Sequence, residues 1–278
     1  MAEEYLAEGA TSFTGTWSGS GFANGATLNI TKRFGPIVTG LDQSGGGMTE
    51  GLESLKVVGD AVGDIGSASA YFMCDFDAAA TSYFLYAPKG GSLWYRPKGD
   101  DNLCTLFEAA GNGTYTIGGG GTVTTLRHSK GIGTVGPDTI VTNLELSGPA
   151  SATIEYNSTA ITAATIMSGN ILMKRVATTL NVDGGNVTID ATAGAITTLN
   201  IRGGNVTILS SGTITKINHY GRNLDLTKLK IGLIITNADL YPNVDRSQWY
   251  TGNPLITATN APVFKGYVSQ ARPTQVFG

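Results

Sequence analysis

Short runs of apolar residues spaced two apart recur along the second half of the chain, and clusters of Gly, Asn, Asp and Ser separate these runs. Alternation of this kind is typical of β-strands with one buried face, and the clusters are typical of turns. No run between the turns has the length or the period of a helix. The pattern therefore predicts an all-β chain with a repeated unit of strand, turn, strand and turn.

The repeat is clearest in two segments that nearly coincide. Thr179–Ile189 reads TLNVDGGNVTI and Thr198–Ile208 reads TLNIRGGNVTI, with a shift of 19 residues between them. Sliding this template outward, with the first apolar residue of each copy as its anchor, gives steps of 16 to 20 residues. The anchors are Leu106, Leu126, Leu144, Ala164, Leu180, Leu199, Ile217 and Ile235.

Other apolar columns accompany the anchor in each copy, which we call a rung. Rungs that keep the same inward columns must stack in parallel about 4.8 Å apart, which defines a parallel β-solenoid. The step does not hold to multiples of six residues, which favours a right-handed β-helix. The side chains expected inside include Val182, Val187, Ile189, Ile201, Val206 and Ile208.

The turns of the repeat carry aligned Asn and Gly residues. Asn186, Asn205 and Asn223 are expected to stack as an amide ladder, each side chain bonding the turn backbone of the next rung. A phosphate-binding loop is not indicated, since no Lys-Ser/Thr pair follows the glycines and no helix begins there. Positive φ angles for tight corners are instead expected at Gly184, Gly185, Gly203 and Gly204.

Three regions are predicted. Residues 1–105 do not fit the repeat, carry most of the aromatic residues, and are expected to form a β-rich domain that caps and anchors the solenoid. Within them, the segment 51–58 could be a short helix or a strand. Residues 106–244 form the solenoid, and the Pro-containing residues 245–278 form an extended C-terminal arm.

Composition excludes several partners. The chain has 39 Gly, only 14% charged residues and a net charge of −3, which gives no basic surface for nucleic acid or for acidic lipids. No apolar window is long enough to span a membrane and the first residues do not resemble a signal peptide, so we expect a soluble protein. Cys74 and Cys104 match no metal-ligand spacing and are expected as buried free thiols.

The outward columns hold little chemistry. One column reads Arg127, Glu145, Thr165, Asn181, Asn200 and Asn218, with a single carboxylate. Asp183 and Arg202 fall on neighbouring rungs, where a surface ion pair is favoured over a catalytic dyad. His128 and His219 fall in an inward column five rungs apart, too far to share a metal ion, and each is expected to hydrogen-bond a loop. We therefore predict no enzyme and no catalytic, metal or cofactor site.

Several motifs carry a family resemblance. They are Trp17, the runs Thr39–Ser44, Leu52–Leu55 and Asp64–Gly66, and, more closely, Gly203–Thr215 and Thr236–Pro242. Through them the chain resembles a family of tailed-bacteriophage virion proteins that join an N-terminal β-region to a Thr/Gly/Asn-rich solenoid. It departs from that pattern at Arg222, where a charged residue stands in a turn, which puts the regularity of the last rungs in question.

The resemblance implies a structural virion protein, namely a capsid decoration or cement protein that is made in the host cytoplasm. Its partner would be the major capsid protein. The long, largely uncharged sides of the solenoid favour association, and the three-fold positions of an icosahedral shell favour a homotrimer, anchored through Glu3–Phe22 or Pro254–Gly278. One alternative is a tail spike or fibre protein that binds host glycan through Tyr156 and Tyr220. Another is a solenoid polysaccharide lyase. The number of copies in each virion separates head from tail.

Overall fold

All elements of the described part of the chain are β-strands. The computed structural model describes residues 3–5, 26–31, 52–76, 82–98, 103–209, 212–221, 223–230, 232–244 and 255–266. No helix in these ranges is long and apolar enough to span a membrane.

The strands form two sheets in which every strand pairing is parallel. Sheet A contains β1 (Glu3–Tyr5), β2 (Ala26–Ile30), β3 (Leu52–Val57), β5 (Tyr83–Tyr86), β7 (Leu103–Ala109), β9 (Thr122–His128), β11 (Ile140–Leu146), β13 (Ile161–Ile166), β15 (Ala177–Val182), β17 (Ile196–Ile201), β19 (Thr213–His219), β21 (Leu233–Leu240), β22 (Ile256–Ala258) and β23 (Val263–Phe264). Sheet B contains β4 (Phe72–Asp75), β6 (Ser92–Lys98), β8 (Thr114–Ile117), β10 (Ile132–Val135), β12 (Ser151–Ile154), β14 (Asn170–Met173), β16 (Asn186–Ile189), β18 (Asn205–Ile208) and β20 (Asn223–Asp225).

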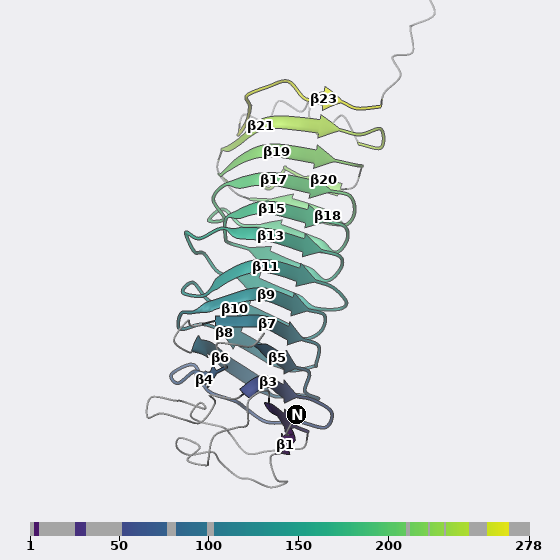
Figure 1. Ribbon diagram of the computed structural model, residues 1–278. Helices are drawn as coiled ribbons and strands as arrows, with labels where there is room; N and C mark the ends of the chain where they lie inside the picture. Colours follow the sequence, from purple (N-terminus) through teal and green to yellow (C-terminus); the bar gives the residue numbers. More distant parts are fainter. Residues whose placement is uncertain are drawn as a thin grey trace, which may run out of the picture.

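Each rung is one strand of sheet A followed by one strand of sheet B, and the predicted parallel β-solenoid is confirmed with about nine turns. In Figure 1 the near strands of sheet A point to the right while the chain climbs, and sheet B returns behind them. This coiling is right-handed, as the sequence favoured and as parallel crossovers generally are.

The number of residues in a rung varies mainly in the connections that lead from sheet B to sheet A. The strands keep their register from rung to rung, as in Thr188 opposite Thr207 in sheet B and Asn181 opposite Asn200 in sheet A. The connections from sheet B to sheet A differ in length. A short one is residues 174–176, between β14 and β15, and a long one is residues 226–232, between β20 and β21. The variation in the number of residues per rung therefore comes mainly from these connections, while the strands remain regular.

The core is a stack of inward columns. The six side chains expected inside, from Val182 to Ile208, are all at most 1% exposed. Between β7 and β15 the interior also contains the column of Cys104, Val123, Val141, Ile161 and Ala177. Because each rung buries only a few side chains, the rungs stabilise one another by stacking.

Two anchors of the sequence template were wrong. Leu126 pairs with Phe107, which is fully buried, whereas Leu106 is only partly buried. At the other end Ala238 pairs with Ile217, and Ile235 belongs to the column three residues earlier. A slip by one residue changes the face of a strand, and the adjacent apolar pair Leu106-Phe107 gave the template two positions to choose from.

The parallel pairing runs through both expected domain boundaries. β5 pairs with β7 and β3 pairs with β5, so sheet A crosses residue 105 without a break. The segment 51–58, left open between helix and strand, contains β3. Beyond residue 244, β22 and β23 pair with β21 and extend sheet A. The solenoid is therefore longer at both ends than the predicted residues 106–244.

Several sequence-based expectations lie outside the described residues. Trp17, Thr39–Ser44, most of the anchor Glu3–Phe22, the segments 245–254 and 267–278, and Arg222 belong to this group. The strands around Arg222 keep the register of the solenoid, since β20 pairs with β18 and β21 pairs with β19.

Candidate functional site

An amide ladder runs along the outer face of sheet B. The side-chain amide Nδ2 of Asn186, Asn205 and Asn223 donates to the Oδ1 of the preceding ladder residue at 2.8, 2.8 and 2.7 Å, and the ladder begins at Asn170. The stacking of these asparagines was predicted, but the hydrogen-bond acceptor was not. Each side-chain amide donates to the side-chain amide of the preceding rung, and not to the turn backbone as expected. An amide offers both a donor and an acceptor, so identical neighbours satisfy each other.

A second amide ladder lies on the outer face of sheet A. Asn200 donates to Asn181 at 2.8 Å and Asn218 donates to Asn200 at 2.7 Å. These residues were placed in one outward column from the sequence, yet no ladder was predicted there. The signal was present, because three identical amides in one column of a parallel stack lie about 4.8 Å apart.

The glycine pairs work by two different mechanisms. Gly185 and Gly204 have φ values of 72° and 67°, as expected for tight corners. Gly184 and Gly203, the first of each pair, are not among the glycines with positive φ, so that part of the expectation was wrong. A Cβ on Gly184 would overlap the Met167 carbonyl oxygen, which shows that close backbone approach requires glycine there.

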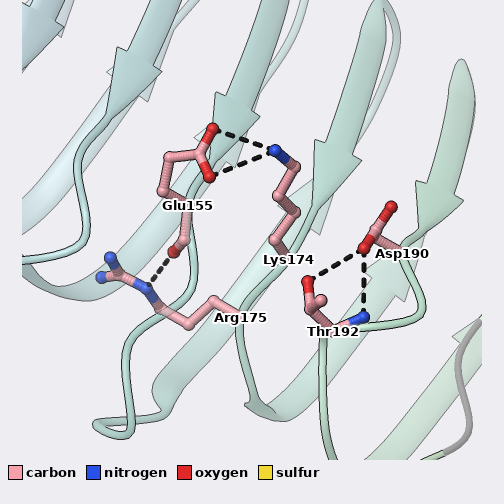
Figure 2. Close-up of polar contacts among 5 residues, drawn as sticks. All are labelled: Glu155, Lys174, Arg175, Asp190 and Thr192. Carbon is pink, nitrogen blue, oxygen red and sulfur yellow. Dashed lines mark hydrogen bonds and ion pairs between the residues drawn. The ribbon is translucent and has the colours of Figure 1, made fainter.

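Charged residues converge at the corner where sheet B returns to sheet A. The Lys174 Nζ donates to both carboxylate oxygens of Glu155, at 3.1 and 3.2 Å, as Figure 2 shows. Asp190, one rung further, accepts hydrogen bonds from the Thr192 N–H at 3.0 Å and from its hydroxyl at 2.9 Å. Lys174 therefore lies between two carboxylates, one on the preceding rung and one on the following rung.

Asp190 in this corner cluster is unsuited to act as a general acid. Partial burial opposes ionisation of Asp190, but the Thr192 hydrogen bonds and the nearby positive charge of Lys174 outweigh it and lower the pKa of Asp190. A general acid needs a carboxyl whose pKa is raised, so that it holds a proton near neutral pH. Asp190 is ionised there, and the geometry is that of a stabilised corner.

Arg175 is the largest fully buried side chain of the described residues. Its Nε donates to the Glu155 carbonyl at 3.0 Å (Figure 2), and its two other nitrogens donate to the Thr139 carbonyl at 2.6 Å and the Gly136 carbonyl at 2.9 Å. Burial lowers the pKa of Arg175 to about 10, which keeps the guanidinium charged at neutral pH. It thus links its own corner to the backbone of the two preceding corners, a role that sequence reasoning missed.

The opposite corner carries a column of side chains from four rungs. Arg202 Nη1 donates to Asp183 at 3.1 Å, and this predicted surface ion pair is confirmed. The Arg202 guanidinium also lies 5.8 Å from the Tyr220 ring centroid, and the Tyr220 and Tyr241 rings stack at 4.0 Å. Tyr220 is therefore engaged from both neighbouring rungs, which leaves it poorly placed to stack on a sugar.

Both histidines are buried in the inward column, as predicted, and lie five strands of sheet A apart. His128 donates from Nε2 to the Lys130 carbonyl at 2.9 Å, which confirms a loop hydrogen bond for this residue. Burial lowers the pKa of His128 to about 4, so it is neutral at physiological pH. The two rings do not form a shared site.

Both thiols of the chain lie in the interior. Cys74 and Cys104 are buried thiols that form no disulfide, as expected, and burial raises the pKa of Cys104 to about 12. Within the ranges that the structure describes, no group of three or more His, Cys, Asp or Glu side chains could hold a metal ion.

Comparison with known proteins adds no identity. No family model, curated protein or solved structure matches this chain. Interpretation of its function therefore depends on its own residues.

Proposed function

We propose that the chain is a structural protein of a tailed-phage virion, bound to the outside of the capsid as a decoration or cement protein. The observation that carries this proposal is that the polar side chains of the outer faces bond to one another from rung to rung. Two amide ladders run along the rod, together with ion pairs between neighbouring rungs such as Arg127–Glu145, Lys174–Glu155 and Arg202–Asp183. Such side chains stabilise the solenoid itself.

A rod of this kind suits a particle exposed to the environment. Surface pairs contribute little singly, but a ladder holds each rung within its span to the next one. The motif resemblance at Gly203–Thr215 and Thr236–Pro242 supports the same assignment, because the described residues of both segments contain strands that pair in the register of the solenoid. The partner in this proposal is the major capsid protein.

Gold-labelled antibody raised against the purified chain tests the location. We expect label over the heads of intact particles, with unlabelled tails. Label confined to the tail tip would favour a spike or fibre protein, and particles without label would exclude a virion component. Release of reducing sugar from host polysaccharide by the purified chain would instead indicate a lyase.

A further inference from the structure

The outer face of sheet A is broad and carries charge only towards its ends. From β7 to β21 every strand presents an outward threonine at the same position, namely Thr105, Thr124, Thr142, Thr162, Thr178, Thr197, Thr215 and Thr236. The strands β13, β15 and β17 have no charged residue. The charges lie on β7, β9 and β11 on one side and on β19 and β21 on the other.

Four of these charges have opposite signs at equal distances from β15. Glu145 on β11 lies two strands before β15, and Lys216 on β19 lies two strands after it. Arg127 on β9 lies three strands before, and Asp239 on β21 lies three strands after. Within one chain they already pair, Arg127 with Glu145 at 2.8 Å and Lys216 with Asp239 at 2.6 Å.

We propose that two copies of the chain associate face to face through sheet A, antiparallel, about a two-fold axis that runs along β15. This arrangement places Arg127 of one copy against Asp239 of the other, and Glu145 near Lys216. Each charge then keeps its partner within the chain and gains one across the interface, and such complementarity fixes register. The inference does not depend on the capsid role.

Parallel arrangements lack this advantage. When two copies meet with their long axes in the same direction, equal rungs face each other, so Arg127 meets Arg127 and Glu145 meets Glu145. Like charges placed opposite each other are destabilising. The trimer expected from the sequence, with three parallel rods, puts equal rungs at equal heights and does not use the opposite signs on either side of β15.

The size of the face fits a second copy. Eight strands from β7 to β21, each of six residues or more, give a footprint of about 20 by 38 Å, close to the roughly 800 Å² per partner of a standard interface. The four-residue strands of sheet B from β8 to β18 cover only about 13 by 29 Å and carry no charge to set a register. Threonine side chains are short and restricted, so burial orders few rotamers.

Sedimentation equilibrium of the full chain tests the dimer. We expect a mass of twice 28.8 kDa, with association that weakens at high salt. The Thr179→Arg substitution on β15 sets two arginines against each other at the axis and should weaken dimerisation at least tenfold, as should Thr179→Glu. Thr207→Arg, on the outer face of sheet B, is the matched control and should leave the dimer intact.

An equal mixture of the Thr179→Arg and Thr179→Glu chains provides the decisive readout. Opposite charges then meet at the axis, so the mixture should form the dimer that neither chain forms alone, which a folding defect could not produce. A wild-type chain that stays monomeric at every concentration, or that forms trimers, overturns the inference. So does a Thr179→Arg chain that dimerises normally, or a mixture of folded variants that remains monomeric. Antibody labelling of virions reports separately on the capsid role.

Discussion

At the scale of single residues, the interior is filled by placing a large side chain in one rung against a small one in the next. Tyr86 lies in register with Ala109, and Tyr115 lies in register with Gly133. All four positions are buried. An inward column therefore need not contain the same residue type in every rung. A substitution in one rung changes the packing of the side chain at the same position in the next rung.

Gly133→Ala tests this packing. A Cβ on Gly133 would overlap the buried ring of Tyr115, so the substitution should lower the free energy of unfolding by about 1–3 kcal/mol. Gly90→Ala is the matched control, because a Cβ there meets no atom within 4 Å. Urea denaturation of the three proteins measures the difference. Equal stability of the two variants would contradict the packing account.

The pH dependence of stability should report His128. Its pKa is about 4 in the folded chain and about 6.5 when unfolded, so the unfolded state binds more protons between these values. The free energy of unfolding should therefore fall by about 3 kcal/mol from this residue as pH decreases through that window. His128→Leu should remove that share of the decrease. Identical pH profiles for both proteins in urea titrations would show that His128 is protonated without cost.

At the scale of elements, the corners are as specific as the strands. The sequence identified the strands because apolar residues two apart recur in each rung, and it aligned Asn186, Asn205 and Asn223. It could not identify Arg175, because a single arginine in a connection of variable length looks like an ordinary surface residue. Its role depends on three carbonyls that lie up to 39 residues away in the chain.

Arg175→Met should be far more damaging than the same change at its neighbour. Loss of the guanidinium leaves three carbonyls in a buried corner without their donor, which should cost about 3 kcal/mol of unfolding free energy. Lys174→Met removes a partly exposed ion pair and should cost less than about 1 kcal/mol. Thermal and urea unfolding compare the two. Similar losses of stability in both variants would argue against a special role for the three hydrogen bonds of Arg175.

Non-additive substitutions can detect the amide ladder of sheet B. Asn186→Thr and Asn205→Thr each remove two ladder bonds, but together they remove three, because one bond is shared. The double variant should therefore be more stable than additivity predicts by about 0.5–1.5 kcal/mol. Asn186→Thr with Asn223→Thr shares no bond and should be additive. Additivity in both pairs would mean that the ladder contributes nothing.

At the scale of the whole molecule, the stack is longer than its sequence repeat. In the rungs of β5, β6 and β7 the interior is aromatic, with Phe84 and Phe107 at 5.1 Å between ring centroids and Tyr95 stacked on Phe107 at 5.7 Å. These bulky residues replace the Val and Ile of the later rungs. The sequence repeat is therefore no longer recognisable there, although the solenoid continues. The sequence also showed which residues lie on the outer faces. It did not show which of them would bond to each other, because that depends on how the strands align from rung to rung.

The number of copies in purified virions tests the central claim most directly. Quantitative mass spectrometry of particles, calibrated against isotope-labelled peptides of this chain and of the major capsid protein, gives that number. A capsid decoration protein should be present in hundreds of copies, in a fixed ratio to the major capsid protein. A few copies in each particle, or none, would contradict the account.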